Sequence, residues 1–144
     1  MREIKFRGKR LFDNKEWKYG FYYLYIDNLG KEFHNILNEE EQVTVNEYGA
    51  TVPAFTNIDK NTLGQYTGLK DVNGKEIYEG DIVLINKEKN IKGIVKYSET
   101  YAEFIVVNTN NITDEYEPLA DYKKYLEILG NEYENPELLE KEGI

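Results

Sequence analysis

The chain contains only one serine and one histidine, the residue types that most often serve as a hydroxyl nucleophile and its general base. Ser98 is the one serine and His34 the one histidine among 144 residues. Nucleophilic catalysis needs a base within hydrogen-bond reach of the hydroxyl and a third group that orients the base. We assign the two residues to different subdomains and expect His34 to be an exposed strand or loop residue. The sequence therefore predicts no catalytic residue and no enzyme.

Three carboxylates lie close together in the middle of the chain, on Glu76, Glu79 and Asp81. They could hold Mg²⁺ for phosphoryl chemistry, but on a strand Glu76 and Glu79 point to opposite faces. A solvated acidic edge explains the same residues. The chain has no cysteine, which excludes disulfides and thiolate zinc sites. We predict no metal and no cofactor.

Basic and aromatic side chains interleave near the N-terminus, and they form the main candidate site. Aromatic platforms beside cations are how sheets and small barrels hold single-stranded nucleic acid. The predicted nucleic-acid contacts are Arg2, Lys5, Arg7, Lys9, Arg10, Trp17 and Lys18. The same aromatic residues would equally serve as core, and the net charge of −9 repels phosphates.

Charge is distributed unevenly along the chain. Residues 1–26 hold seven basic and three acidic residues, a net charge of +4, whereas residues 99–144 hold three basic and twelve acidic residues, a net charge of −9. Copies of such a chain can associate basic end to acidic end, which predicts a homo-oligomer. The acidic half could instead dock on a basic host protein, or it could be a solvated surface.

The first half of the chain is predicted to form an antiparallel sheet. A strand over residues 2–8 is followed by a stronger one over residues 17–26, in which aromatic residues recur at every second position. Both faces of this second strand are apolar from Phe21 onward, so we expect it to be covered on both sides. Shorter strands are expected at residues 33–37 and 42–46, on either side of a solvated acidic run.

An edge strand is expected just before Pro53, because proline cannot donate to a ladder. The polar residues 59–61 mark a boundary between an N-terminal β subdomain, residues 1–62, and a second subdomain, residues 63–144. We expect the edge at Pro53 and the lysine-rich tip at residues 87–89 to be open to pairing between subunits.

The second subdomain begins with tight turns. The residues predicted to make them are Gly64, Gly68, Asn73, Gly74 and Gly80. A two-residue turn at Asn73-Gly74 would place Asp71 opposite Glu76, two like charges. A four-residue turn from Asp71 to Gly74 is therefore favoured.

Strands over residues 81–85, 91–97 and 102–107 then form a meander, the usual start of a small barrel. One or two helical turns over residues 118–125 and a last strand over residues 125–129 follow. Asn135 and Pro136 are typical of a helix start, which predicts a short C-terminal helix over residues 137–141.

Three stretches of the chain resemble the YopX family of phage and prophage proteins. They are residues 1–7, residues 64–83 (GQYTGLKDVNGKEIYEGDIV) and residues 128–139, and the long middle stretch resembles the member that gives the family its name. The resemblance implies a mostly β protein with an SH3-like second half, encoded by a bacterial virus or its integrated remnant. It implies no activity. Gly8 and Lys9 depart from the alanine and tryptophan that many relatives carry there.

These observations predict a mainly β (β-rich α+β) protein with an N-terminal antiparallel sheet, a small SH3-like barrel and a short C-terminal helix. The expected role is a non-enzymatic, self-associating binding or structural module in the cytoplasm of a bacterial host. The alternatives are a nucleic-acid-binding protein and an acidic factor that binds a host protein. No apolar run is long enough to span a membrane, so no membrane partner is expected.

Overall fold

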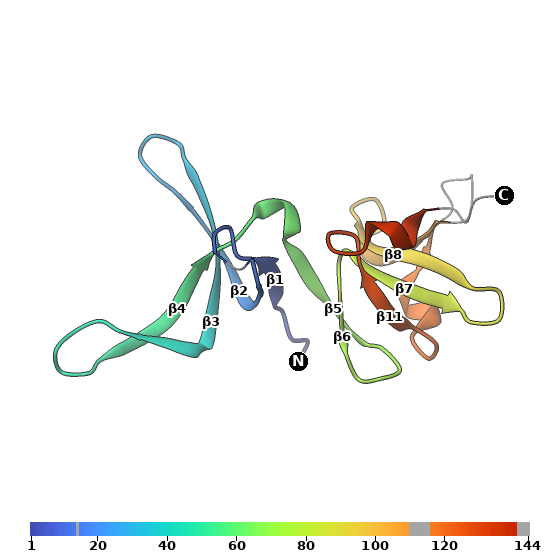
Figure 1. The fold of residues 1–144 in the computed structure, drawn as a ribbon, viewed down its shortest axis with the longest axis horizontal. Helices are drawn as coiled ribbons and strands as arrows, with labels where there is room; N and C mark the ends of the chain where they lie inside the picture. The colour runs from blue at the N-terminus through green and yellow to red at the C-terminus, as the bar shows by residue number, and fades with distance from the viewer. Residues whose placement is uncertain (14, 110–115, 141–144) are drawn as a thin grey trace. The chain divides into compact units, whose positions relative to one another are not determined.

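The computed structural model describes residues 1–13, 15–109 and 116–140, and it confirms a mainly β protein (Figure 1). The chain divides into two compact units, Met1–Gln65 and Tyr66–Ile144, which we call unit 1 and unit 2. In the described residues, all strand pairs are antiparallel. Helical structure in these residues is limited to three short 3₁₀ segments.

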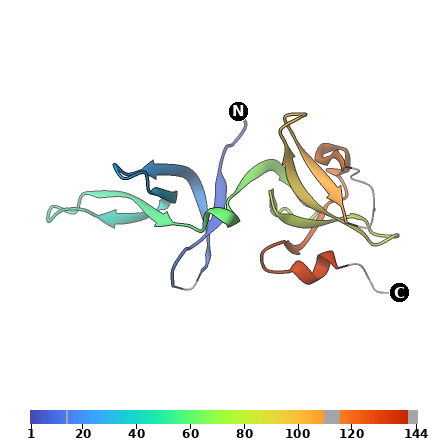
Figure 2. The same ribbon diagram turned by 90° about the horizontal axis from the view of Figure 1, so that it is seen from above.

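Unit 1 contains four strands and the start of a fifth. They are β1 (Phe6–Lys9), β2 (Trp17–Ile26), β3 (Glu32–Thr44), β4 (Thr51–Asn57) and β5 (Gly64–Lys70), with a 3₁₀ turn at Lys60–Thr62. The sheet order is β4-β3-β2-β1, and β1 also pairs with the first two residues of β5. Figures 1 and 2 show the β2–β3 and β3–β4 hairpins as two long ribbons with tips that diverge.

β3 is one long strand where the sequence predicted two. Its register with β4 shifts between the pairs Asn38–Ala54 and Gln42–Pro53, so the acidic run at residues 39–41 forms a bulge. Bulges accommodate extra residues without ending a strand. The polar run therefore interrupts the ladder locally, while the strand continues through it.

The core of unit 1 is small. Of the twelve buried hydrophobic residues in the described part of the chain, only Ile36 and Ile58 belong to this unit. Both faces of β2 remain half open: Phe21 is 49% exposed and Tyr23 50%, and on the opposite face Ile26 is 53% exposed. The prediction that β2 is covered on both sides is thus wrong for the single chain.

Unit 2 forms around an open five-stranded sheet. Its strands are β7 (Asp81–Asn86), β8 (Ile91–Ser98), β9 (Glu103–Asn108), β10 (Tyr116–Pro118) and β11 (Glu127–Asn131), whereas the short β6 (Glu76–Tyr78) pairs with β5. The sheet order β10-β9-β8-β7-β11 contains the predicted β7–β8–β9 meander. No pair of described residues joins β10 to β11, so the closed SH3-like barrel is not confirmed.

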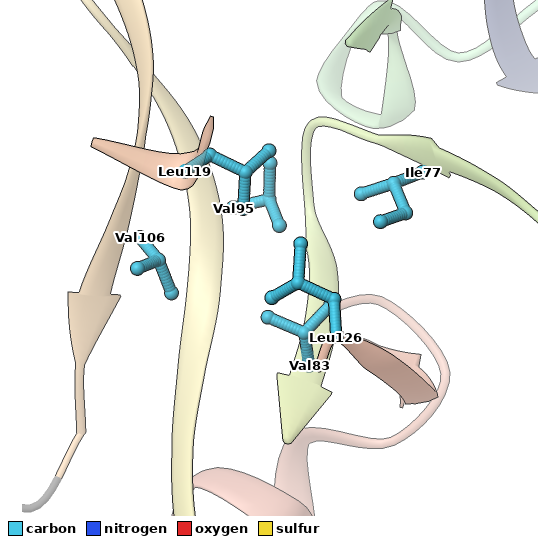
Figure 3. Close-up of a cluster of buried hydrophobic side chains, with 6 residues drawn as sticks. All are labelled: Ile77, Val83, Val95, Val106, Leu119 and Leu126. Atoms are coloured by element: carbon cyan, nitrogen blue, oxygen red, sulfur yellow. The ribbon is translucent and has the colours of Figure 1, made fainter. Parts of the chain in front are cut away.

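The core of unit 2 is a well-buried aliphatic cluster (Figure 3). Side chains from the strands and from the 3₁₀ turn Leu119–Tyr122 point into it. Its members are Ile77, Val83, Val95, Val106, Leu119 and Leu126, all at most 2% exposed. This unit therefore buries the apolar surface that a domain of its size needs.

The expected C-terminal helix is a single 3₁₀ turn, Pro136–Leu139, drawn in red after β11 in Figure 2. Asn135 precedes it but makes no capping bond from its side chain; its Oδ1 instead accepts from the backbone N–H of Asn131, 3.2 Å away. The last predicted helical residue, Lys141, lies outside the described residues.

The structure places the glycines of the predicted turns in different kinds of backbone. Gly74 (φ +82°) closes the four-residue turn, in which its N–H donates to Asp71 O at 3.0 Å, and Gly80 (φ +88°) lies between β6 and β7. Gly68 (φ +84°) sits inside β5, where the register with β6 shifts. The prediction of a turn at Gly64 is wrong. Gly64 begins β5 and pairs with Arg7, because the turn lies earlier in the chain, at the 3₁₀ segment Lys60–Thr62.

Candidate nucleic-acid interface

The register of β1 against β2 places two predicted cations beside the predicted aromatic platform. Arg7 pairs with Tyr19 and Lys9 with Trp17, so all four share one face of the sheet. The guanidinium carbon of Arg7 lies 4.6 Å from the centroid of the Trp17 ring, and Lys9 Nζ lies 5.7 Å from it. Both distances are within the range of cation–π attraction. The Trp17 ring therefore already binds cations of its own chain.

Lys18 lies opposite Gly8, on the other face of the sheet. Its Nζ is 2.7 Å from Glu16 Oε1 and 2.9 Å from Glu41 Oε1. The hydrogen bonds to Glu16 and then Glu41 raise the pKa of Lys18 above its ordinary value. This lysine is charged and held by two carboxylates, and a phosphate would have to compete with both.

The remaining predicted cations lie around the start of the chain. Arg10 approaches Asp13 Oδ2 at 3.4 Å and Glu16 Oε1 at 3.8 Å. Lys5 Nζ lies 3.0 Å from Glu3 Oε1, and Arg2 is exposed. The structure thus brings the seven predicted residues into one region of unit 1, where Lys5, Arg10 and Lys18 lie beside carboxylates and Arg7 and Lys9 lie over the Trp17 ring.

A second polar cluster, not predicted from the sequence, connects β2 and β3. The Oη of Tyr22 lies 2.7 Å from His34 Nδ1, and His34 Nε2 lies 3.1 Å from Glu32 Oε2. His34 is half-buried and lies beside a cavity of about 350 Å³. The alternation of β2 and β3 was visible in the sequence, but the cross-strand register that joins these three residues was not.

Tyr22 and Glu32 differ in what they can offer to the imidazole of His34. Burial, helped by the negative charge of Glu32, raises the pKa of Tyr22 above its ordinary value. An ionised carboxylate only accepts, so Glu32 accepts a hydrogen bond from the proton on His34 Nε2; when the imidazole is neutral, Nδ1 then accepts from the Tyr22 hydroxyl. A phenol held in its neutral form is a poor nucleophile, so the cluster is suited to holding β2 and β3 in register.

The other chemically interesting residues have structural roles. Asp81 is 2% exposed, and its Oδ2 accepts from the N–H of Tyr78 at 2.8 Å. Ser98 Oγ accepts from the N–H of Tyr101 at 3.3 Å, in unit 2, whereas His34 belongs to unit 1. Within the described ranges, no three His, Cys, Asp or Glu residues are grouped so that they could hold a metal ion.

The family model described as YopX protein matches residues 5–140 of the chain. The chain belongs to the YopX family. The crystal structure of protein EF1440 from Enterococcus faecalis is similar, with a TM-score of 0.59 and 22% identity over 97% of this chain and 100% of that chain. The crystal structure of yopX from Bacillus subtilis has a TM-score of 0.45 and 19% identity, over 96% and 98% of the two chains. No curated protein matches the chain.

At 22% identity, the likeness to EF1440 shows a shared fold, and it leaves the function of this YopX-family chain to be argued from its own residues. Gly8 packs against Ile58, whose side chain a Cβ at this position would overlap. The ammonium group of Lys9 lies over the Trp17 ring. In the part of the chain that the structure describes, no helix is long and apolar enough to cross a membrane.

Proposed function

We propose that this YopX-family protein is a non-enzymatic binding or structural module, encoded by a phage or prophage, that acts as an assembly of identical chains in the bacterial cytoplasm. The observation that carries the proposal is the incomplete burial of unit 1. A β-sheet must bury at least one apolar face to be stable. In unit 1, however, several large aromatic side chains of β2 and β4 are about half exposed.

The size of the core supports the same conclusion. A unit of 65 residues that buries only Ile36 and Ile58 among its described hydrophobic residues has little to offset its conformational entropy. Small domains of this kind commonly gain the missing stability from disulfides, metals or association. The chain has no cysteine, so disulfides are excluded and association is the simplest source.

Strand β4 offers a route for such association. It is the outer strand of its sheet, with Pro53 in its middle, and an outer strand exposes backbone groups to pairing. The tip at residues 87–89 does not serve this purpose, because it joins β7 and β8, two inner strands of the second sheet. The edge predicted at Pro53 thus remains in the proposal, and the one at the lysine tip does not.

Light scattering coupled to size-exclusion chromatography tests the proposal. At tens of micromolar, we expect a mass that is a multiple of the 16.9 kDa chain. A mass of one chain at that concentration would contradict self-association.

A basic host protein is a second candidate partner, and the charge of unit 2 favours it. Residues 66–144 hold nine basic and seventeen acidic residues, a net charge of −8. Such a surface attracts basic proteins at low salt. Binding of purified basic partners that an increase in salt does not weaken would contradict this electrostatic interpretation. Nucleic-acid binding is less favoured, because the candidate cations are largely engaged within the chain.

A further inference from the structure

We infer that the copies of this protein associate through one face of the sheet in unit 1, and that the same face of a second copy covers it. The inference rests on the self-association proposed above and names the surface. We call this surface the aromatic face; it consists of Phe21, Tyr23, Tyr25, Phe33, Leu37 and Phe55.

The strand registers place these residues together. Phe21 pairs with Leu37, which in turn pairs with Phe55, so a row of three apolar side chains crosses β2, β3 and β4. Tyr23 packs diagonally on Phe55 with ring centroids 5.9 Å apart, and Tyr25 packs on Phe33 at the same distance. Side chains on one face of neighbouring strands form a continuous surface. The aromatic face is therefore one patch.

This patch is open to solvent in the single chain. Phe21 is 49%, Tyr23 50%, Tyr25 50% and Phe55 57% exposed. With about 200 Å² for each aromatic side chain, these four leave about 400 Å² per copy in water. Two copies would bury about 800 Å² from these residues alone, half of the roughly 1,600 Å² of a standard interface. An apolar patch of about 400 Å² is of the size that commonly marks an interaction site.

The charges favour a second copy over other occupants. The six residues of the aromatic face carry no cation themselves, and the lysine beside them, Lys31, holds its Nζ over the Phe33 ring, 5.1 Å from the ring centroid. Binding of a nucleic-acid backbone needs several cations along its path. Unit 1 holds nine basic and ten acidic residues, a net charge of −1, and two copies of it repel little. Unit 2, at −8, repels itself. Contact between copies through unit 1 therefore meets less charge repulsion than contact through unit 2, and homodimer interfaces are more apolar than the rest of a protein surface.

A charge placed in the centre of the patch tests the inference. We expect Phe55→Lys to give a monomer by light scattering at a concentration where the wild-type protein is associated, because the lysine would be buried against its own copy. The matched control is Tyr48→Lys, on a residue that is 88% exposed in the turn between β3 and β4, and this variant should associate like the wild type. A wild-type monomer would overturn the proposed function. An associated wild type with an equally associated Phe55→Lys variant would overturn only the choice of surface.

Cross-linking gives a second measurement that needs no destabilising charge. Because the chain has no cysteine, a single one can be introduced at Tyr23 and compared with one at Tyr125, which is 69% exposed in unit 2. When identical faces meet, a short bis-maleimide should link two copies of Tyr23→Cys and few of Tyr125→Cys. Equal cross-linking of the two variants would contradict the inferred surface, as would a link at Tyr125→Cys alone.

Discussion

The guanidinium of Arg7 lies over the ring of Trp17, with its central carbon 4.6 Å from the ring centroid, and Arg7 is only 6% exposed. We expect this contact to contribute to the stability of unit 1. Because so little of Arg7 reaches solvent, the side chain would have to move outward before a ligand could bind it. Arg7 and Trp17, which were predicted to contact nucleic acid, therefore pack against each other as part of the fold. The contact leads to two measurable predictions.

The first concerns stability. We expect Arg7→Met to lower the free energy of unfolding by about 1–2 kcal/mol, since a desolvated cation–π contact contributes that much. The matched control is Lys9→Met, because Lys9 Nζ lies farther from the same ring, at 5.7 Å, and is less buried. Urea titration at one fixed protein concentration, followed by Trp17 fluorescence, measures both variants. A cost for Lys9→Met equal to that for Arg7→Met would contradict the assignment.

The second concerns nucleic acid. Fluorescence anisotropy with labelled single- and double-stranded oligonucleotides at low salt should show no binding tighter than about 100 μM, the weak end of non-specific DNA binding. The reason is that Lys18, Arg10 and Lys5 all contact carboxylates of their own chain. Micromolar binding that is lost in an Arg2→Ala, Lys5→Ala double variant would restore the nucleic-acid hypothesis.

Strand periodicity and turn chemistry made much of the fold predictable. The alternation in residues 17–26 identified β2 with its observed bounds, and the charge conflict between Asp71 and Glu76 selected the observed turn. The two parts of β3 were predicted, but their continuity was missed because three consecutive glutamates look like a loop, and only pairing with β4 shows that they form a bulge. The Tyr22–His34 contact was missed for a related reason: register is set by tertiary structure.

Asp71 organises the turn that the sequence identified, and its ionisation should be visible in the pH dependence of stability. Its carboxylate accepts backbone N–H groups from Asn73, Lys75 and Ile128 at 2.8, 2.9 and 3.1 Å. Burial raises the pKa of Asp71, but these donors outweigh burial, and the pKa lies below the ordinary value of 3.8.

When folding lowers the pKa of a carboxyl, its ionised form stabilises the folded protein at pH values above the pKa that the group has in the unfolded chain. This stabilisation is lost as the pH falls through the pKa that the group has in the folded protein. We therefore expect Asp71→Asn to cost about 1–3 kcal/mol at pH 7, with a difference from wild type that shrinks below about pH 4. The exposed Asp121→Asn serves as control and should cost little. A difference for Asp71→Asn that stays constant down to pH 2 would contradict the role of its charge.

Gly20 allows β2 and β3 to approach each other closely. Its φ is +154°, and a Cβ built there would overlap the backbone carbonyl of Leu37. We expect Gly20→Ala to destabilise unit 1 by more than about 2 kcal/mol, because backbone cannot move aside as a flexible side chain can. Gly30→Ala is the control: φ is +82° there with no atom near a Cβ, so its cost should be about 1 kcal/mol from backbone strain alone. If urea titrations show the same loss in free energy of unfolding for Gly20→Ala and Gly30→Ala, the close approach of Gly20 to the Leu37 carbonyl does not matter for stability.

The claim on which the other conclusions depend is that a second copy supplies the burial that unit 1 lacks. The single tryptophan of the chain, Trp17, lies in unit 1 and reports its unfolding directly. We expect the urea midpoint of unfolding, followed by Trp17 fluorescence, to rise when the protein concentration is raised from about 1 to about 100 μM. A hundredfold change in the concentration of a binding partner changes the free energy of unfolding by about 2.7 kcal/mol. A midpoint that is the same at both concentrations would contradict the account.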